Sequence, residues 1–467
     1  MTPTAPALLR HETPPPIADT NTALMRQLLA LALPVLAENV LHMMVGLNDT
    51  YLANHLPREA ASAGAAVGTI TYFLWFMGLI VGSVGTGATA LISRARGSRH
   101  RSLANSVCGQ SMAMALILGV VMGAAMYLAA GPVIGCTGLG GTAPPLALSY
   151  LRMLSVTLPF MFAMLIASAC LRGDGDTLSP AIIMIIVDAI NMLCSFALCR
   201  GWWGLPVMGF NGIALGTIIA YVAGGVLQFL LLLRGRPTMR LHLHRLWPHW
   251  NTLKRLFRIG IPAGTEGLVN WLANFGVIRV INGIDPTNVM PNAHMNTIRL
   301  ESVSFMTGMA FGTAAATMVG ISLGMKSPAR AIRSTWLAYA IGGGAMTLFG
   351  ILFITVGHYP AAWLSPDNPQ IAELTTRCLR ITGCIQSGFA AYIIFSGALR
   401  GAGDTFVVMV ISLATVIVLR FAGVLVVGAW LHQGLAAIWV VLATELFLRG
   451  LLALGRFQQG GWRRIRV

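Results

Sequence analysis

The residues of this chain that could do chemistry are acids embedded in long apolar stretches. Six of the fifteen Asp and Glu residues lie within such stretches: Glu38, Asp49, Asp188, Glu266, Glu301 and Glu445. A charged side chain inside a membrane costs about 2.5–3.5 kcal/mol on insertion scales, so each of the six is a candidate functional residue. Glu445 is followed one helical turn later by Arg449, which favours a structural ion pair there.

Three polar residues share one face of the first apolar stretch. At about 100° per residue, Glu38, His42 and Asp49 fall within about 40° of one another. Two carboxylates and an imidazole on one stripe suit the binding and release of a proton. The alternative is structural: Asp49 would hydrogen-bond locally at the helix end, and His42 would be a packing histidine.

A similar stripe occurs in the second half of the chain. Glu266, Asn270 and Asn274 follow one another at four-residue spacing along one helix face. Carboxylate and amide oxygens suit a hard cation such as sodium, and they suit contact with a substrate equally well. Glu301, beside Arg299, either supplies a further ligand or pairs with a basic residue.

A third polar stripe lies on the fifth apolar stretch. Asp188, Asn191 and Ser195 recur there at three- and four-residue spacing, which places them on one side of a helix. Carboxylate and amide oxygens again allow a cation to bind. The two candidate sodium sites are therefore Asp49 with Asp188 and Asn191, and Glu266 with Asn270.

The elements that position these residues are membrane-spanning helices. The chain is 56% hydrophobic and 10% charged, whereas soluble proteins carry about 25% charged residues. A bilayer core needs about 20 apolar residues per helix. Twelve stretches have this character: 28–54, 62–92, 104–130, 147–170, 178–200, 210–233, 259–283, 294–324, 335–358, 374–399, 406–430 and 434–455. We therefore predict an all-α polytopic membrane protein with twelve transmembrane helices.

The distribution of basic residues predicts the orientation. Counting the N-terminus and every second connection gives 22 Lys and Arg on one face, and only Arg58 and Arg200 on the other. Because basic residues accumulate in cytoplasmic connections, we predict a multi-pass protein of the cell (plasma or inner) membrane with both termini in the cytoplasm. The net charge of +16 then reflects the basic residues of the cytoplasmic connections. A composition as apolar as this one also excludes a disordered or nucleic-acid-binding chain.

The two halves of the chain resemble each other at a nearly constant offset, which is 228 positions for two matches and 227 for the second-helix ends at 85–97 and 312–324. LRGDGDT at 171–177 recurs as LRGAGDT at 399–405, and Pro34 and Glu38 also recur at the offset of 228. With six spans per half, both repeats start on the same side of the membrane. They are therefore parallel repeats, which form two six-helix lobes around a central cleft. We interpret the repeated loop as a tight turn whose Asp and Thr cap the next helix.

The repeat divides the chain into five segments. These are a cytoplasmic N-terminal tail at 1–26, an N-lobe at 27–234, a basic cytoplasmic linker at 235–258, a C-lobe at 259–456 and a cytoplasmic tail at 457–467. Residues 234–258 contain seven Lys or Arg, three His and no acid, interleaved with Leu, Trp and Phe. This pattern predicts a surface helix that lies against anionic lipid.

Several segments together resemble the multidrug and toxic compound extrusion (MATE) transporters. They are LALPVLAENVLHMMVGLNDTYLANHL at 31–56, ATALISRARG at 88–97, LRGDGDTLSP at 171–180, RIGIPAG at 258–264, SFMTGMAFGTAAATMVGISLG at 304–324 and LRGAGDT at 399–405. The resemblance covers roughly residues 25 to 460. It implies two six-helix lobes and the export of amphipathic, often cationic compounds in exchange for protons or sodium ions.

The resemblance also bears on individual residues. The family commonly has an acid before Thr where Asp49 stands, which favours Asp49 for ion coupling. In one branch of the family an Asn is followed four residues later by an acid. Asn191 matches that Asn, Ser195 stands in the acid's place, and Asp188 would act from the adjoining turn, facing Asp49. In the C-lobe, Asn270 stands where many relatives carry a glutamate, and an apolar residue stands where they carry an aspartate on the tenth helix.

The favoured function is a secondary active multidrug exporter that works by alternating access. The coupling ion would be a proton or sodium, with no other cofactor. The alternatives are a lipid-linked saccharide flippase or another exporter of the same superfamily and, less favoured, a channel. A membrane-embedded enzyme is disfavoured because the sequence has no H-E-x-x-H motif, nucleophile elbow or Walker A loop. Expected partners are the lipid bilayer and small-molecule substrates, with no nucleic acid and no obligate protein partner.

Overall fold

The computed structural model describes residues 20–56, 60–137, 139–236, 238–285, 287–431 and 433–465. All regular secondary structure within these ranges is helical, which confirms the predicted all-α fold. Eleven of the described helices are long and apolar enough to cross a membrane. Most of the predicted N-terminal tail, Arg58 and the last two residues lie outside the described part of the chain.

The first six helices form the N-lobe. They are α1 (Asn21–Asn54), α2 (Ala60–Gly97), α3 (Arg101–Gly135), α4 (Ala143–Gly173), α5 (Leu178–Arg200) and α6 (Phe210–Arg234). Helix α1 begins inside the predicted tail because Thr20 caps it: the Thr20 hydroxyl accepts a hydrogen bond from the Ala23 backbone N–H.

The second half of the chain forms the C-lobe, in which two spans are interrupted by π-helical turns. Its members are α7 (Trp250–Ile284), α8 (Val289–Gly324), α9 (Pro328–Ala338), α10 (Gly344–Thr355), α11 (His358–Leu364), α12 (Pro369–Gly401), α13 (Thr405–Thr415), α14 (Ala422–Val424) and α15 (Leu435–Gln459). A π-turn at Tyr339–Gly343 joins α9 to α10, and others at Val416–Phe421 and Leu425–Trp430 flank α14. Helix α7 contains the seventh predicted span, 259–283, and is the one predicted span not among the eleven apolar helices, since it carries Glu266, two asparagines in its middle and Arg279.

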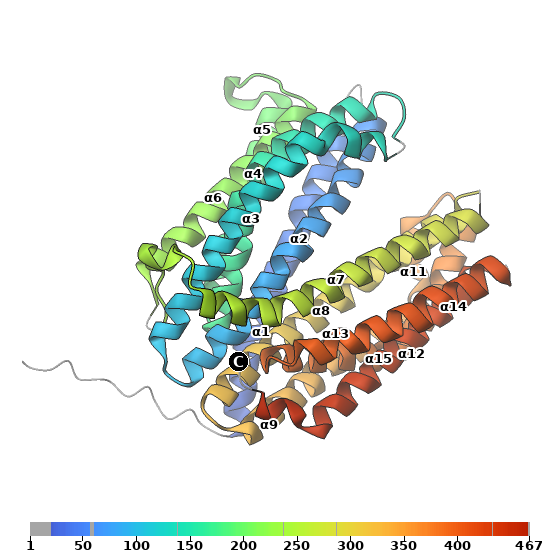
Figure 1. Cartoon of the computed structure of the whole chain (residues 1–467). Coiled ribbons are helices and arrows are strands. Elements are labelled where there is room, and N and C mark those ends of the chain that lie inside the picture. The colour runs from blue at the N-terminus through green and yellow to red at the C-terminus, as the bar shows by residue number, and fades with distance from the viewer. Residues whose placement is uncertain are drawn as a thin grey trace, which may run out of the picture.

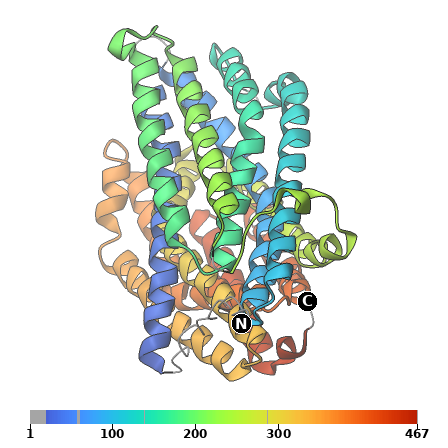
Figure 2. The ribbon, with the colours of Figure 1, turned by 90° about the vertical axis from the view of Figure 1, so that its left-hand side faces the viewer.

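The two lobes approach each other at one end and diverge towards the other (Figure 1). Leu24 and Leu28, in the first turns of α1, are buried together with Phe311 and Met318 of α8, so α1 begins inside the C-lobe core. Figure 2 shows α1 and the C-lobe helices converging at this end of the molecule.

Helices α2 and α8 touch through two glycines that the repeat relates. A Cβ added at Gly97 would lie 2.0 Å from the carbonyl oxygen of Ile321, and one added at Gly324 would lie 2.3 Å from that of Arg94. Only glycine allows so close a backbone approach. The contact between the lobes therefore passes through equivalent positions of the two repeats.

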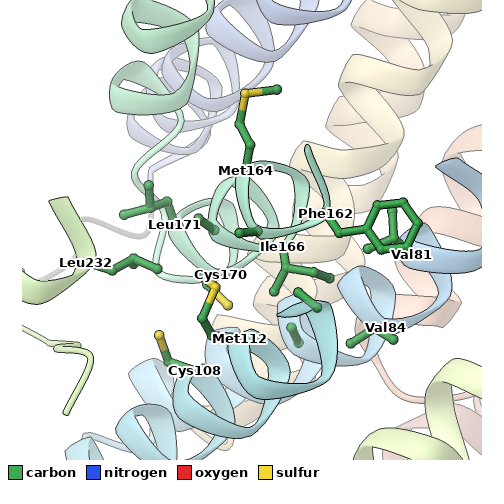
Figure 3. Packing of buried hydrophobic residues seen from close by; sticks show 14 of the residues in the cluster. Val81, Val84, Cys108, Met112, Phe162, Met164, Ile166, Cys170, Leu171 and Leu232 are labelled. Carbon is green, nitrogen blue, oxygen red and sulfur yellow. The ribbon is translucent and has the colours of Figure 1, made fainter. Parts of the chain in front are cut away.

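The N-lobe core is built from side chains of α2, α3 and α4. Figure 3 shows part of it: Val81 and Val84 of α2 lie near Phe162 and Ile166 of α4, and Cys108 and Met112 of α3 lie near Cys170 of α4. All seven cysteines lie in the described chain and none forms a disulfide. Cys108 and Cys170 are buried in this apolar cluster, where they pack as small hydrophobic side chains.

The basic linker forms the predicted surface helix only in its last part. Residues 235–249 contain one 3₁₀ turn, Leu243–Leu246, whereas 250–258 form the start of α7, with Lys254, Arg255 and Arg258 exposed. Pro248 interrupts any longer helix because it has no backbone N–H to donate. The side chain of Gln110 on α3 takes up the freed backbone groups: its amide nitrogen donates to the carbonyls of Arg245 and Trp247, each at 2.7 Å, and its oxygen accepts from the His249 N–H at 3.0 Å.

Candidate functional site

The N-lobe holds one deeply buried carboxylate that is bound by neutral groups. Asp49, near the end of α1, is 4% exposed. Its carboxylate accepts hydrogen bonds from the Tyr150 hydroxyl on α4 at 2.8 Å and the Thr217 hydroxyl on α6 at 2.7 Å. It also accepts from the Asn191 amide on α5 at 3.3 Å. Three helices thus supply donors to one acid, and none of these donors carries a charge.

Asn191 links this acid to a wider set of polar groups. Its amide nitrogen reaches the Thr217 hydroxyl at 3.0 Å and the Ser195 hydroxyl at 3.5 Å, while its oxygen accepts from the Asn48 amide at 2.8 Å. The structure therefore brings together Asp49, Asn191 and Ser195, as their spacing suggests. Sequence reasoning missed Tyr150, Thr217 and Asn48.

Two other predicted members of the N-lobe site lie outside this hydrogen-bonded set. Asp188 is half-buried, and no hydrogen bond or ion pair joins it to another described residue. His42 is largely exposed, and its ring meets that of Tyr221 edge-on at 6.3 Å between centroids. Neither side chain contacts the Asp49 carboxylate.

Glu38 forms an ion pair that recurs in the other lobe. One terminal nitrogen of Arg172, at the end of α4, donates to both Glu38 oxygens at 2.9 Å. In the C-lobe, one terminal nitrogen of Arg400 donates to the two oxygens of Glu266 at 2.8 and 2.9 Å. Both residues of the second pair lie 228 positions after those of the first. The shared offset of the Glu and of the Leu-Arg-Gly motif was a signal for this pairing that sequence reasoning did not use.

The repeated loop also forms the expected tight turn. Gly175 and Gly403 adopt φ values of 75° and 87°, which glycine tolerates best. In the N-lobe turn, Asp176 accepts from the backbone N–H of Ser179 at 3.0 Å at the start of α5. The arginine that precedes each turn is the one that pairs with the glutamate. The repeated motif therefore supplies both a tight turn and the basic partner of an ion pair.

The C-lobe buries a second acid among arginines. Glu445 on α15 is fully buried and pairs with Arg420 at 2.6 Å and with Arg449, the partner predicted from their spacing. Arg449 also donates to the Asn270 oxygen at 3.0 Å, and Arg420 to the Asn274 oxygen at 2.9 Å. The two amide oxygens that the sequence suggests as sodium ligands are thus in contact with guanidinium groups.

The remaining C-lobe candidates are held by hydroxyl groups. Glu266 accepts from the Tyr392 hydroxyl at 2.9 Å and the Ser412 hydroxyl at 2.8 Å in addition to Arg400. Glu301 accepts from the Thr382 hydroxyl and does not contact Glu266. Among the described residues, no three His, Cys, Asp or Glu side chains gather as a transition-metal site would require.

A cavity of about 220 Å³ lies between the lobes. Helices α2 and α4 of the N-lobe and α8 and α12 of the C-lobe line it. Most of its wall is glycine, alanine and aliphatic side chains. The charged residues on this wall are Arg172 and Arg400, the two arginines of the repeated ion pairs.

The chain matches a known family in both halves. The MatE family pattern covers residues 34–197 and 262–426. The probable multidrug resistance protein NorM of Thermotoga maritima is 29% identical over 445 residues, which cover 94% of this chain and 93% of that protein. An FAD transporter of Shewanella oneidensis is 26% identical over 399 residues, covering 84% and 86% of the two chains.

The fold also matches solved structures. A multidrug resistance MATE family transporter of the MOP superfamily, in an outward-facing conformation, superposes with a TM-score of 0.85. The superposition covers 95% of this chain and 97% of that chain at 18% sequence identity. At this identity the likeness establishes a common fold.

Proposed function

Since the chain belongs to the MatE family of membrane transporters, we propose that it is a secondary active exporter. It would carry amphipathic compounds out across the cell membrane in exchange for protons or sodium ions. In this proposal the chain needs no cofactor beyond the coupling ion, and its partners are the lipid bilayer and the transported compound. The charge asymmetry between its connections supports an orientation with both termini in the cytoplasm.

The environment of Asp49 carries the proposal. Its carboxylate is buried, and the groups bonded to it are two hydroxyls and an amide. A proton can therefore bind and leave without breaking an ion pair. A sodium ion would find the Asp49 carboxylate beside the Thr217 hydroxyl oxygen, and the Asn191 amide, which here turns its nitrogen to Asp49, would have to rotate to offer its oxygen as a further hard ligand. The carboxylates of Glu38, Glu266 and Glu445, by contrast, are already neutralised by arginines.

The arrangement of the lobes supports alternating access. The lobes meet at the end where α1 begins and diverge away from it (Figure 1). With the termini in the cytoplasm, the lobes of this conformation would be in contact on the cytoplasmic side and apart on the outer side. An ion and a substrate that favour different states of one equilibrium become coupled through that equilibrium.

Gradient-driven transport in proteoliposomes tests the proposal. Efflux of a dye substrate should rise under an imposed pH or sodium gradient, and Asp49→Asn should reduce the gradient-driven part at least tenfold. Glu373→Gln, which removes one partner of an exposed ion pair with Arg377, is the matched control and should transport normally. Transport that responds to neither gradient would rule out antiport, and full activity of Asp49→Asn would rule out the Asp49 site.

The class of substrate is a separate question. The relatives include proteins described as multidrug resistance proteins and one described as an FAD transporter. These substrates differ in charge, so family membership does not fix the polarity of the compound that this chain carries.

A further inference from the structure

We infer that the cavity between the lobes binds the anionic group, a phosphate or a carboxylate, of an amphipathic compound. The inference rests on the proposed function only in taking that compound to be the transported one. It differs from the cationic substrates that the family resemblance implies.

The charge on the cavity wall is the first observation. Arg172 enters from the N-lobe and Arg400 from the C-lobe, and no carboxylate lines this cavity in the described chain. Glu38 and Glu266 contact the arginines but are not part of the wall. Each pair is close to neutral overall, but the group that faces the cavity is the guanidinium, so at short range the wall attracts an anion and disfavours a cation.

The geometry of the two arginines is the second observation. Each uses a single terminal nitrogen for its glutamate, and the side chains remain 20% and 24% exposed. A guanidinium is a planar group with five donors that matches the oxygens of a carboxylate or phosphate. The glutamates hold the arginines in place before a ligand arrives, which lowers the entropy cost of binding.

The rest of the wall suits the apolar part of such a compound. Leu165, Met309 and Ile393 supply apolar side chains from three different helices. A Cβ added at Gly78 or Gly82 would meet nothing within 4 Å, so these glycines leave open space. A cavity of about 220 Å³ has room for an anionic group and part of a ring.

Binding of three naphthalene probes that differ in charge tests the inference. The full chain in phosphatidylcholine nanodiscs would be dialysed to equilibrium against 1-naphthyl phosphate, 1-naphthalenemethanol or 1-naphthylmethylammonium. We expect saturable binding of the phosphate, at least tenfold tighter than that of the other two. Equal or tighter binding of the ammonium compound would overturn the inference.

Variants locate the bound phosphate. Arg172→Gln and Arg400→Gln should each weaken binding of 1-naphthyl phosphate about tenfold, because each removes one charge-assisted contact. Gly82→Leu keeps every charge, fills the cavity and should also abolish binding. Arg377→Gln removes an exposed arginine elsewhere and should bind normally. If Gly82→Leu and both arginine variants bind 1-naphthyl phosphate as tightly as Arg377→Gln does, the phosphate lies elsewhere and the inference fails. If the arginine variants do not fold, the result for Gly82→Leu alone decides whether the probe binds in this cavity.

Two further comparisons separate the possible sources and the two proposals. In the first comparison, part of the phosphatidylcholine is replaced by phosphatidylglycerol. If the ligand is a soluble compound, binding of 1-naphthyl phosphate should not change. If a lipid head group enters the same site, phosphatidylglycerol should compete with the probe and weaken its binding. Gradient-driven efflux without binding of naphthyl phosphate overturns this inference alone. Binding without any gradient-driven transport overturns the proposed function alone.

Discussion

The N-lobe and the C-lobe share a backbone plan and one ion pair, but they treat their buried acids differently. Glu38 with Arg172 and Glu266 with Arg400 occupy equivalent places. Beyond these pairs, the N-lobe surrounds Asp49 with neutral donors, whereas the C-lobe surrounds Glu445 with two arginines. The comparison separates a carboxylate that can exchange an ion from one that is fixed by opposite charge.

A position-by-position comparison shows how the difference arises. At the offset of the repeat, Asp49 corresponds to Val277, and Thr217 corresponds to Glu445. The acid therefore stands on the first helix of one repeat and on the last helix of the other. Arg420 lies in a π-turn, where the helix is locally widened. The two repeats therefore carry their buried acids at different positions, one among neutral donors and the other among arginines.

The largest expected effect is the loss of the C-lobe acid. Glu445→Gln leaves Arg420 and Arg449 buried without their counter-charge, and the free energy of unfolding should fall by about 3–5 kcal/mol. Denaturant titration in mixed micelles, followed by tryptophan fluorescence, measures the change. Glu373→Gln at the exposed pair is the control. Equal stability of the two variants would contradict a structural role for Glu445.

The repeated ion pairs should differ in their tolerance of arginine loss. After Arg400→Gln, Glu266 keeps the hydroxyls of Tyr392 and Ser412. After Arg172→Gln, no other described side chain donates to Glu38. Because each hydrogen bond contributes about 1 kcal/mol, Arg172→Gln should lower the free energy of unfolding by about 1–2 kcal/mol more than Arg400→Gln. The reverse order would show that burial of Glu266 outweighs its hydroxyl donors.

Asp49→Asn should destabilise the protein only modestly. The amide has nearly the shape of the carboxylate and keeps one oxygen for Tyr150 or Thr217, whose hydroxyls can rotate. We expect a loss of about 1 kcal/mol in the same titration, alongside the strong loss of gradient-driven transport. A loss as large as that of Glu445→Gln would remove the distinction between the lobes.

The smallest effect concerns the turn between α4 and α5. Burial raises the pKa of the Asp174 carboxyl, while the Thr238 hydroxyl that donates to it acts in the opposite direction. A carboxyl whose pKa is higher in the folded state than in the unfolded state stabilises the protein below the unfolded-state pKa of about 3.9. This contribution to the free energy of unfolding is lost as the pH rises through the folded-state pKa. The equivalent C-lobe residue is Ala402. Between pH 4 and pH 7 the free energy of unfolding of Asp174→Asn should therefore rise by about 0.5 kcal/mol relative to that of wild type, as measured by unfolding at each pH.

The helices and the repeat could be predicted from the sequence because both signals are contained in the chain itself. The joint location of Asn191 and Ser195 was also accessible, since their spacing sets a common helix face. The stripe of Glu38, His42 and Asp49 shows the limit of that reasoning. Eleven residues separate Glu38 from Asp49, or about 16 Å along a helix, so residues on one face can belong to different sites.

The donors around Asp49 were not predictable for a physical reason. Tyr150 and Thr217 lie 101 and 168 residues from Asp49, and only the packing of α1 against α4 and α6 brings them together. The surface helix predicted for the linker forms only over 250–258, because composition indicates an affinity for lipid but does not reveal the interruption at Pro248 or the hydrogen bonds of Gln110 to the linker backbone. Arg172, in contrast, could have been matched to Glu38 through the repeat.

The attachment of the linker has a mechanical consequence. Gln110 holds its backbone, Met239 and Leu241 are buried in the N-lobe core, and Arg236 pairs with Asp176. The linker thus moves as part of the N-lobe and has little freedom to lengthen or swing. A rotation between the lobes would act on the two helices that contact both of them, α7 and α1. Each has a proline near the point of passage, Pro262 and Pro34, which removes a backbone hydrogen bond and weakens the helix there. The repeat thus places one bendable helix at the start of each copy.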